Sequence, residues 1–438
     1  MQTCLVSLRH AFGLVLSALL IACGGGGSET VSATAPVISN LTVSPAAVYN
    51  DTDPLTFNAA FDFHDADGNI ATMTLRVRDE SDGSVLDLGT DPLDGMQGAI
   101  SGTILGEFMA SGVEPGTYTV LINVTDSSDQ ASNVLGAPVR IATYPWTSQL
   151  ADPTAREYAA SAVLDGKLYV AGGQITHSGS TPGPATNTVS VYDPASNTWS
   201  SAHPMPTARM GLTLTAHDGK LYAIGGRTDG FSASSVGKVE IYDPATNSWA
   251  IGSEVGFTPR YHAAAAVLPQ TSFGDLIVVA GGEAESNVLA TVQGYNPNTN
   301  AWVGLQDLPT ARGQLGMAAV DGTLYAIGGY AGVASQWVGT VEAYNPLLGS
   351  WAPRAAMPTT RAHLSLVAIN GQLLAAGGEN VSRALDVLES YDPVTDVWTS
   401  KTNSQIPFAR AAAGAVDHRM FVFGDGLTLR YDAAHEIR

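Results

Sequence analysis

The chain has 438 residues with 40 acidic and 20 basic side chains, which gives a formal net charge of −20 at pH 7. This charge repels nucleic acid and anionic lipid alike, so we expect no nucleic-acid partner. Hydrophobic residues make up 45% of the chain and charged residues only 14%, a composition typical of a protein with more than one β-rich core.

Residues 1–23 have the features of a targeting segment. A basic residue precedes an apolar run over 11–21 that is too short to cross a bilayer as a helix. The run leads into the tetrapeptide LIAC, which resembles the lipobox of bacterial lipoproteins, and the resemblance implies that Cys23 is lipidated and begins the mature chain. The residue after Cys23 is glycine rather than aspartate, and the same resemblance therefore favours an anchor in the outer membrane. The protein would then face the periplasm or the cell surface. An ordinary signal peptide cut nearby is the alternative.

Two regions follow the targeting segment. Residues 24–34 are dominated by Gly, Ser, Thr and Ala, which predicts a flexible tether. Residues 35–142 contain alternating runs such as LTFNAAFDF, ATMTLRVRD and GTYTVLINVTD between turn-rich segments, a pattern typical of an antiparallel β-sandwich. With no cysteine pair, this region resembles an Ig-like or cadherin-like domain. We expect it to act as a spacer that holds the rest of the chain off the membrane.

One segment of the sandwich suggests a cation. The run from His64 to Asn69 reads HDADGN, and calcium prefers clustered carboxylate and carbonyl oxygens. Asp65 and Asp67 are the candidate ligands, although the closing Glu of an EF-hand loop is missing. The alternative is an ordinary turn between strands, because Asp and Gly are common in both. We expect no cofactor other than this candidate Ca²⁺.

Residues 143–438 repeat one unit of about 50 residues. Most units contain, in order, an Arg, an apolar run, an Asp-Gly or Asn-Gly pair, a second apolar run ending in Gly-Gly, a third run ending in Tyr-Asp-Pro or Tyr-Asn-Pro, and a Trp. The arginines recur at intervals of 49 to 53 residues, and this periodicity favours a structural role. They are Arg156, Arg209, Arg260, Arg312, Arg361 and Arg410.

The order of these residues predicts four antiparallel strands in each unit. Asp-Gly and Asn-Gly supply the positive φ that a two-residue hairpin needs. Gly-Gly ends the second strand and lets neighbouring backbones approach closely. Proline stops the third strand because it lacks the donor that a ladder requires. Tyr and Trp are large enough to fill the space between adjacent wedge-shaped sheets.

The two ends of the repeat region predict a closed ring. The sixth unit stops after Tyr431 without a Trp strand, and Trp146 lies in phase, 53 residues before Trp199. We therefore expect the strand at Trp146 to pair with the last strand, which removes both open sheet edges. The units resemble kelch repeats. The resemblance implies an all-β protein with a six-bladed kelch-type β-propeller over 143–438, preceded by the antiparallel Ig-like β-sandwich.

The kelch resemblance leaves the function open. Kelch-type propellers include bacterial sialic-acid mutarotases, galactose-oxidase-like enzymes and protein-binding adaptors. The galactose-oxidase cofactor is a crosslink between a Tyr and a Cys, whereas here Cys4 lies in the targeting segment and Cys23 is the predicted lipidation site. That chemistry is therefore disfavoured. The sequence also contains no nucleophile elbow, phosphate loop or dense metal motif, so we lean against an enzyme.

Residues that break the repeat are the candidate ligand-binding residues. The loop between strands two and three and the connection between units lie on one face of a propeller, where variable groups could form an asymmetric pocket. Solvated loop decoration is the alternative reading. The loop candidates are Gln174, His177, Arg227, Glu283, Tyr330, Trp337 and Glu379. Two residues after the arginines stand the candidates Tyr158, His262 and His363, with Gly211, Gln314 and Ala412 in the same phase.

These observations predict an envelope-anchored lipoprotein whose propeller binds a glycan, or an envelope or extracellular protein, on this face. A carbohydrate-active enzyme of the sialic-acid mutarotase type is the first alternative. An acid–base pair such as Glu283 with His262 or His363 could then move the protons of sugar ring opening. A purely structural envelope component is the second alternative.

Overall fold

The computed structural model describes residues 5–10, 14–22, 34–50, 54–93, 98–99, 101–110, 113–175, 183–228, 234–285, 287–332 and 336–436. Cys4, Cys23, most of the predicted tether and His177 lie outside these ranges. The chain divides into two compact units, one of Met1–Tyr144 with His435–Arg438 and one of Pro145–Ala434. Over the described ranges the regular structure consists of strands and one 3-10 turn, η1 (Ala433–His435). No helix there has the length and apolar character that crossing a membrane requires.

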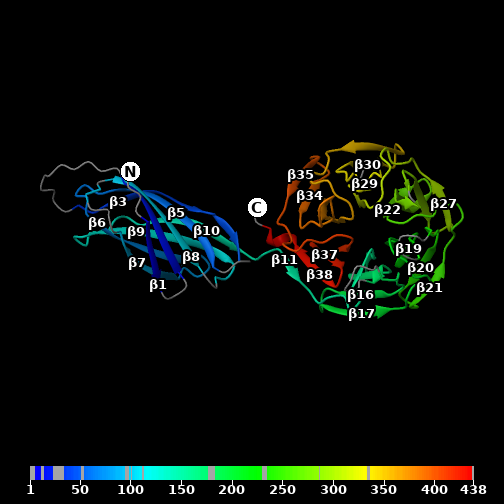
Figure 1. Cartoon of the computed structure of the whole chain (residues 1–438), viewed down its shortest axis with the longest axis horizontal. Helices are drawn as coiled ribbons and strands as arrows, with labels where there is room; N and C mark the ends of the chain where they lie inside the picture. The colour runs from blue at the N-terminus through cyan, green and yellow to red at the C-terminus, as the bar shows by residue number, and fades with distance from the viewer. Residues whose placement is uncertain are drawn as a thin grey trace. The chain divides into compact units, whose positions relative to one another are not determined.

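The first unit contains two five-stranded sheets in its described part (Figure 1). Neighbouring strands run antiparallel except β4 and β10, which are parallel. One sheet has the order β1 (Leu5–His10), β2 (Leu14–Ala22), β8 (Ser101–Ala110), β5 (Leu55–His64) and β3 (Val37–Ser44). The other has the order β4 (Ala47–Tyr49), β10 (Leu135–Ala142), β9 (Gly116–Asp126), β6 (Ile70–Asp79) and β7 (Val85–Pro92).

Strand β5 shows how the sequence builds the core of this unit. Leu55, Phe57, Ala59, Phe61 and Phe63 are buried, whereas the side chains between them are not. A period of two places these five residues on one face of the strand. They join a single core to which both sheets contribute. The Ig-like or cadherin-like character of the unit stays a prediction.

The second unit contains six four-stranded sheets among its described residues, arranged as a ring (Figure 1). We number the sheets in the chain order of the strands β13, β18, β22, β28, β32 and β36, one from each sheet. The first sheet consists of β13 (Ala160–Leu164), β14 (Lys167–Ala171), β16 (Val189–Asp193) and β17 (Thr198–Ala202). The second consists of β18 (Thr213–His217), β19 (Lys220–Ile224), β20 (Val239–Asp243) and β21 (Ser248–Ile251). The third consists of β22 (Ala264–Thr271), β23 (Gly274–Ala280), β26 (Val292–Asn296) and β27 (Ala301–Gly304). The fourth sheet consists of β28 (Gly316–Val320), β29 (Thr323–Ile327), β30 (Val341–Asn345) and β31 (Ser350–Arg354). The fifth consists of β32 (Ser365–Ile369), β33 (Gln372–Ala376), β34 (Leu388–Asp392) and β35 (Val397–Ser400). The sixth consists of β36 (Ala412–Val416), β37 (Arg419–Gly424), β38 (Leu427–Asp432) and β11 (Trp146–Ser148). Two short pairs accompany them, β12 (Arg156–Glu157) with β15 (Gln174–Ile175) and β24 (Glu283–Ala284) with β25 (Asn287–Val288).

The Tyr and Trp of each unit join neighbouring sheets. Tyr192 and Trp199 lie opposite each other on β16 and β17, with ring centroids 5.0 Å apart. The Tyr192 hydroxyl donates to Asn197 in the turn between them, and Trp199 Nε1 donates to the carbonyl oxygen of Leu150 in the connection that enters the sheet, both at 2.8 Å. The same type of Trp bond, 2.8–2.9 Å long, is made in the other sheets by Trp146, Trp249, Trp302, Trp351 and Trp398.

The first strand of the second unit completes its last sheet. β11 pairs antiparallel with β38, with Trp146 opposite Tyr431, as the phase of Trp146 predicts. The Trp146 side chain is buried, and its ring lies 5.1 Å from that of Tyr431. The amide of Asp432 also donates to the carbonyl oxygen of Pro145 at 2.9 Å. The sixth sheet therefore has no open edge at β38.

The periodic arginines bind within their own sheets. Arg312 Nη1 donates to Glu342 Oε2 at 2.7 Å, and Nη2 donates to the carbonyl oxygen of Ala326 at 3.0 Å, so the side chain ties together β29 and β30. The carbonyl oxygen of Arg312 instead links two sheets, because it accepts the amide of Gly282 at 3.0 Å. A Cβ on Gly281 would collide with that oxygen, which explains the glycine pair. Five arginines are 0–2% exposed: Arg156, Arg209, Arg260, Arg312 and Arg361.

Candidate functional site

Six main-chain hydrogen bonds form a circle around the axis of the second unit. Each amide donates to the carbonyl oxygen of the preceding member at 2.7–3.2 Å. All six residues have positive φ, between 49° and 63°. The members of this axial circle are Tyr158, Gly211, His262, Gln314, His363 and Arg410. Five of them share the phase that the sequence predicts, but Ala412, expected in the sixth place, lies in β36.

The sixth unit differs from the prediction because its arginine does not occupy the buried position of the other five arginines. Arg410 stands in the axial circle with 36% of its side chain exposed, so it does not belong to the buried structural arginines. Phe408 occupies the buried position instead. Its carbonyl oxygen accepts the amide of Gly378 at 2.8 Å, just as that of Arg361 accepts the amide of Gly329 at 2.9 Å. Arg410 follows a proline by three residues, as most of the buried arginines do, and this spacing concealed the shift.

The axial circle lines a cavity of about 110 Å³. Tyr158, His262 and His363 occupy alternate places in the circle and contact one another. Tyr158 stacks on His262 with ring centroids 5.1 Å apart, and the His363 ring lies nearly perpendicular to both, at 5.3 Å from Tyr158 and 4.9 Å from His262. The three residues lie in the connections that lead into the first, third and fifth sheets, so the pocket exists only in the closed ring.

Each histidine of the pocket is bonded to a carboxylate. His262 Nδ1 lies 3.2 Å from Glu283 Oε1, and His363 Nδ1 lies 2.8 Å from Glu379 Oε1. Gln314 Nε2 donates to Glu283 Oε1 at 2.9 Å. Because an ionised carboxylate only accepts hydrogen bonds, both Nδ1 atoms carry the proton. The opposite nitrogen, Nε2, is buried in both rings and has no hydrogen-bond partner among the described residues.

The surroundings keep these groups in defined charge states. Burial, opposed in part by the hydrogen bond to Glu379, lowers the pKa of His363 to about 4. Burial also opposes ionisation of Glu379, but His363 and Arg410 together leave the pKa of this carboxyl below its ordinary value. The pKa of Glu283 is lowered in the same way, by His262 and Gln314 against the effect of burial. At neutral pH His363 therefore offers a neutral acceptor at Nε2.

Both terminal nitrogens of Arg410 bond to acidic side chains, whereas its Nε is buried and has no hydrogen-bond partner among the described residues. Its Nη1 donates to Glu157 at 3.2 Å and its Nη2 donates to Glu379 at 2.9 Å, while the guanidinium carbon lies 5.3 Å from the centre of the Tyr158 ring. Burial raises the pKa of the Tyr158 hydroxyl to about 12, although the positive charge of Arg410 opposes this rise. Two carboxylates therefore balance the charge of Arg410.

The other loop candidates that the structure describes do not line the pocket. Gln174 is buried and donates to the carbonyl oxygen of Gly183 at 2.8 Å, within its own loop. Arg227 is also buried, with its guanidinium 4.4 Å from the centre of the Tyr261 ring. Tyr330 and Trp337 form a β-bridge with each other, and their rings are 5.7 Å apart. The structure thus brings Tyr158, His262, His363, Glu283 and Glu379 together, and adds Gln314 and Arg410.

The candidate metal ligands lie in the first unit, in the turn between β5 and β6. Burial, contact with Asp67 and the charge of Asp126 raise the pKa of Asp65 to about 6. Across the described residues, no three His, Cys, Asp or Glu side chains stand together as a metal-binding group. Carboxylates alone therefore do not complete a metal shell at this turn.

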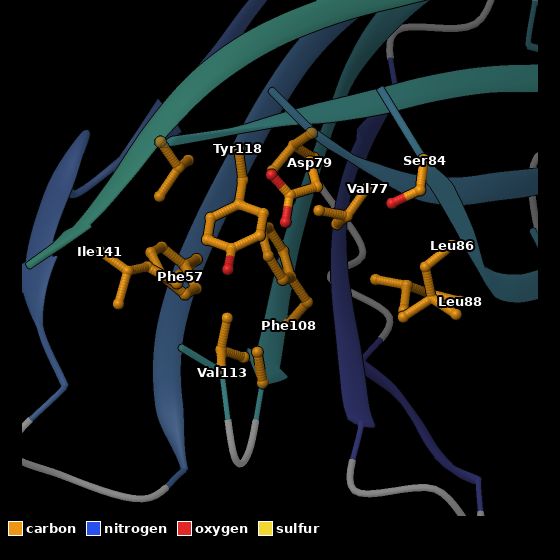
Figure 2. Close-up of a pocket in the computed structure, with 13 residues that line it drawn as sticks. Phe57, Val77, Asp79, Ser84, Leu86, Leu88, Phe108, Val113, Tyr118 and Ile141 are labelled. Atoms are coloured by element: carbon orange, nitrogen blue, oxygen red, sulfur yellow. The ribbon is translucent and has the colours of Figure 1, made fainter. Parts of the chain in front are cut away.

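A separate cavity of about 310 Å³ opens between the sheets of the first unit (Figure 2). Its lining is mainly apolar, with Tyr118 standing beside Phe57 and Phe108 and with Asp79 as the acidic member. The Tyr118 hydroxyl donates to the carbonyl oxygen of Glu114 at 2.9 Å. Six strands contribute to this lining without a shared motif, so nothing in the sequence marked it.

Comparisons with protein families cover most of the second unit. The Kelch motif model matches residues 155–206, and the KLHDC2/KLHL20/DRC7 Kelch-repeats domain matches residues 211–426. Among solved structures, that of YjhT is similar in fold, with a TM-score of 0.50 and 18% identity, covering 66% of this chain and 95% of YjhT. The second unit is therefore a kelch-repeat β-propeller.

Curated relatives match less than half of this chain. Kelch-like protein 40 of Xenopus tropicalis is 26% identical over 186 residues, which are 42% of this chain and 28% of the relative. Kelch-like protein terF of Aspergillus terreus is 28% identical over 212 residues, which are 47% of this chain and 45% of the relative. The matches thus span less than half the length of these relatives.

Proposed function

We propose that the chain is an envelope-anchored lipoprotein whose six-bladed kelch propeller binds a glycan or protein ligand at the axial pocket, with the Ig-like unit as spacer. The observation that carries this proposal is the pair of buried Nε2 atoms of His262 and His363, which lack partners among the described residues. A buried polar atom without a partner costs about 1–3 kcal/mol. A ligand that donates hydrogen bonds to these nitrogens would recover that cost.

The charges of the pocket define the chemistry of this ligand. The pocket offers acceptors on His262 and His363, while Gln314 Nε2 and the two terminal nitrogens of Arg410 already bond to carboxylates. An anionic ligand would have to compete with Glu157 and Glu379 for the terminal nitrogens of Arg410. A hydroxyl or an amine fits better, so the ligand is either a neutral glycan or a protein that presents a Ser, Thr or Lys side chain. The kelch repeats themselves support a protein partner.

A binding screen with matched variants tests the proposal. The mature chain is screened against glycans and envelope proteins, and each hit is measured with His363→Phe, Glu379→Gln and Asp243→Asn. Asp243 is the last residue of β20, at the end of the strand that leads to the opposite rim of the propeller. Loss of the pocket acceptor should weaken binding by about 1–4 kcal/mol, as for a hot-spot residue, whereas Asp243→Asn should bind like the native chain. Equal affinity of all three variants would place the ligand elsewhere.

A sugar mutarotase is the second candidate, because each histidine with its carboxylate resembles a general base. With Nδ1 held by Glu283 or Glu379, Nε2 is free to take a proton from the anomeric hydroxyl of a sugar. The neutralised Arg410 argues against a carboxylated sugar as substrate. Anomerisation followed by NMR separates the two functions: an enzyme shows a pH-dependent rate that His262→Phe abolishes, and a binding protein shows none.

A further inference from the structure

The turn between β5 and β6 contains a buried carboxylate with one free oxygen. Asp65 is 1% exposed, and its Oδ2 accepts the amide of Asn69 at 2.8 Å. Its Oδ1 is buried and has no partner among the described residues. An unsatisfied carboxylate oxygen in the interior is costly, because burial removes the water that would solvate it. The turn alone therefore does not explain Asp65.

A second buried carboxylate lies next to this turn. Asp126 ends β9 and is the strand partner of Ile70, the residue that follows Asn69. The amide of Ser127 donates to the carbonyl oxygen of Asn69 at 3.0 Å, which fixes the two segments together. Asp126 is 2% exposed, and its Oδ2 is again buried without a partner among the described residues. Two buried carboxylates from distant parts of the chain thus lie near enough for the charge of Asp126 to act on Asp65.

The side-chain amide of Asn69 lies against both Asp65 and Asp67. One terminal atom of this amide lies 3.2 Å from Asp67 Oδ1 and 3.2 Å from Asp65 Oδ2. If that atom is the nitrogen, it donates to both carboxylates, yet Oδ1 of Asp65 and Oδ2 of Asp126 stay unsatisfied. If it is the oxygen, three oxygens converge without a donor between them. A spacing near 3.2 Å is what adjacent ligands show around a cation that they hold at about 2.3–2.6 Å.

We propose that Asp65, Asp67 and Asn69 bind a calcium ion, with the buried carboxylate of Asp126 adding a third negative charge. All the donor atoms are oxygens in an irregular turn, which suits Ca²⁺ better than Mg²⁺ or a transition metal. Two carboxylates and one amide do not complete a shell of six to eight ligands, so main-chain oxygens and water supply the rest. The ion would lock the β5–β6 turn to the end of β9 and stabilise the first unit.

Calorimetric titration of the full mature chain, freed of metal with EDTA, tests the site. We expect one Ca²⁺ to bind with a dissociation constant of about 10⁻³ M or tighter, as in extracellular modules, and Mg²⁺ to bind at least tenfold more weakly. Saturating Ca²⁺ should also raise the melting temperature, because it binds only the folded state. Absence of both heat and a thermal shift would overturn the proposal, and equal affinity for Mg²⁺ would overturn the assignment to calcium.

Two variants localise the ion. Asp67→Asn changes a partly exposed side chain, so the unit should fold, and it should weaken Ca²⁺ binding at least tenfold. Asp87→Asn is the matched control, since Asp87 is an exposed residue of β7 away from this turn. Unchanged binding by Asp67→Asn, or an equal loss in Asp87→Asn, would refute the site. Asp65→Asn in EDTA is a further check: removal of one buried charge should raise the metal-free melting temperature and abolish the Ca²⁺ response.

Discussion

The amide of Tyr158 donates to the carbonyl oxygen of Arg410 at 3.0 Å, across 252 positions of the sequence. This bond closes the axial circle at the point where the first and sixth sheets meet. It also places the Arg410 guanidinium against the Tyr158 ring. The ring must therefore close before the pocket can form.

Removal of β11 should open the ring. A chain that begins at Asp152 lacks the strand that covers β38, whereas one that begins at Ala142 retains it. We expect the shorter chain to aggregate or to melt well below the longer one, because it exposes a strand edge and loses the buried Trp146. In the full chain, Trp146→Ala should cost about 3–5 kcal/mol in the free energy of unfolding. Identical thermal melts of the two truncated chains would show that closure by β11 contributes nothing.

The buried arginines and Arg410 should differ in their effect on stability. Arg312→Met leaves the buried Glu342 carboxylate without its cation, which should lower the free energy of unfolding by about 3–5 kcal/mol. Arg410→Met is the matched comparison, and because its ion pairs are partly exposed it should cost about 1 kcal/mol or less. Arg312→Met with Glu342→Leu should regain most of the loss. Urea denaturation of the four chains measures these differences, and equal losses for Arg312→Met and Arg410→Met would contradict the assignment.

Acidification should destabilise the propeller through His363. Its folded-state pKa of about 4 lies below the ordinary value of about 6.5, so the unfolded chain takes up the proton first. Stability should therefore fall as the pH drops from about 6.5 to about 4, by at most about 3 kcal/mol. His363→Phe should flatten this slope, whereas replacement of the exposed His203 by Asn should leave it intact. Melting curves at pH 7, 5.5 and 4.5 test this, and an unchanged slope in His363→Phe would assign the effect to other groups.

Lipidation depends on the LIAC tetrapeptide. We expect Cys23→Ala to abolish incorporation of labelled fatty acid and to release the protein from the membrane fraction. Cys4→Ala is the control, because Cys4 lies in the segment that is predicted to be removed. Acyl labelling that persists in Cys23→Ala would rule out the lipobox.

The sequence by itself determined the repeat and the strand order. Asp-Gly pairs, Gly-Gly pairs and Tyr–Trp pairs act through local backbone geometry and through contacts with the adjacent strand, so each unit can be read separately. The place of Trp146 in the period was enough to predict its pairing with the last strand. The position two residues after each periodic arginine likewise predicted Tyr158, His262 and His363 as ligand-binding candidates. In the structure their rings contact one another.

Only the tertiary structure decided which of the periodic and loop residues form the site. The spacing from a proline predicted Arg410 at the buried position of the sixth unit, but Phe408 occupies it. The reason is that Phe408 packs against the glycine pair of the fifth unit. Gln174 and Arg227 do not line the pocket, because Gln174 bonds within its own loop and Arg227 packs over the Tyr261 ring. In the first unit, Asp126 joined Asp65 and Asn69 through strand pairing between segments about 60 positions apart. Such long-range pairing depends on the register of whole sheets, which no local pattern in the sequence encodes.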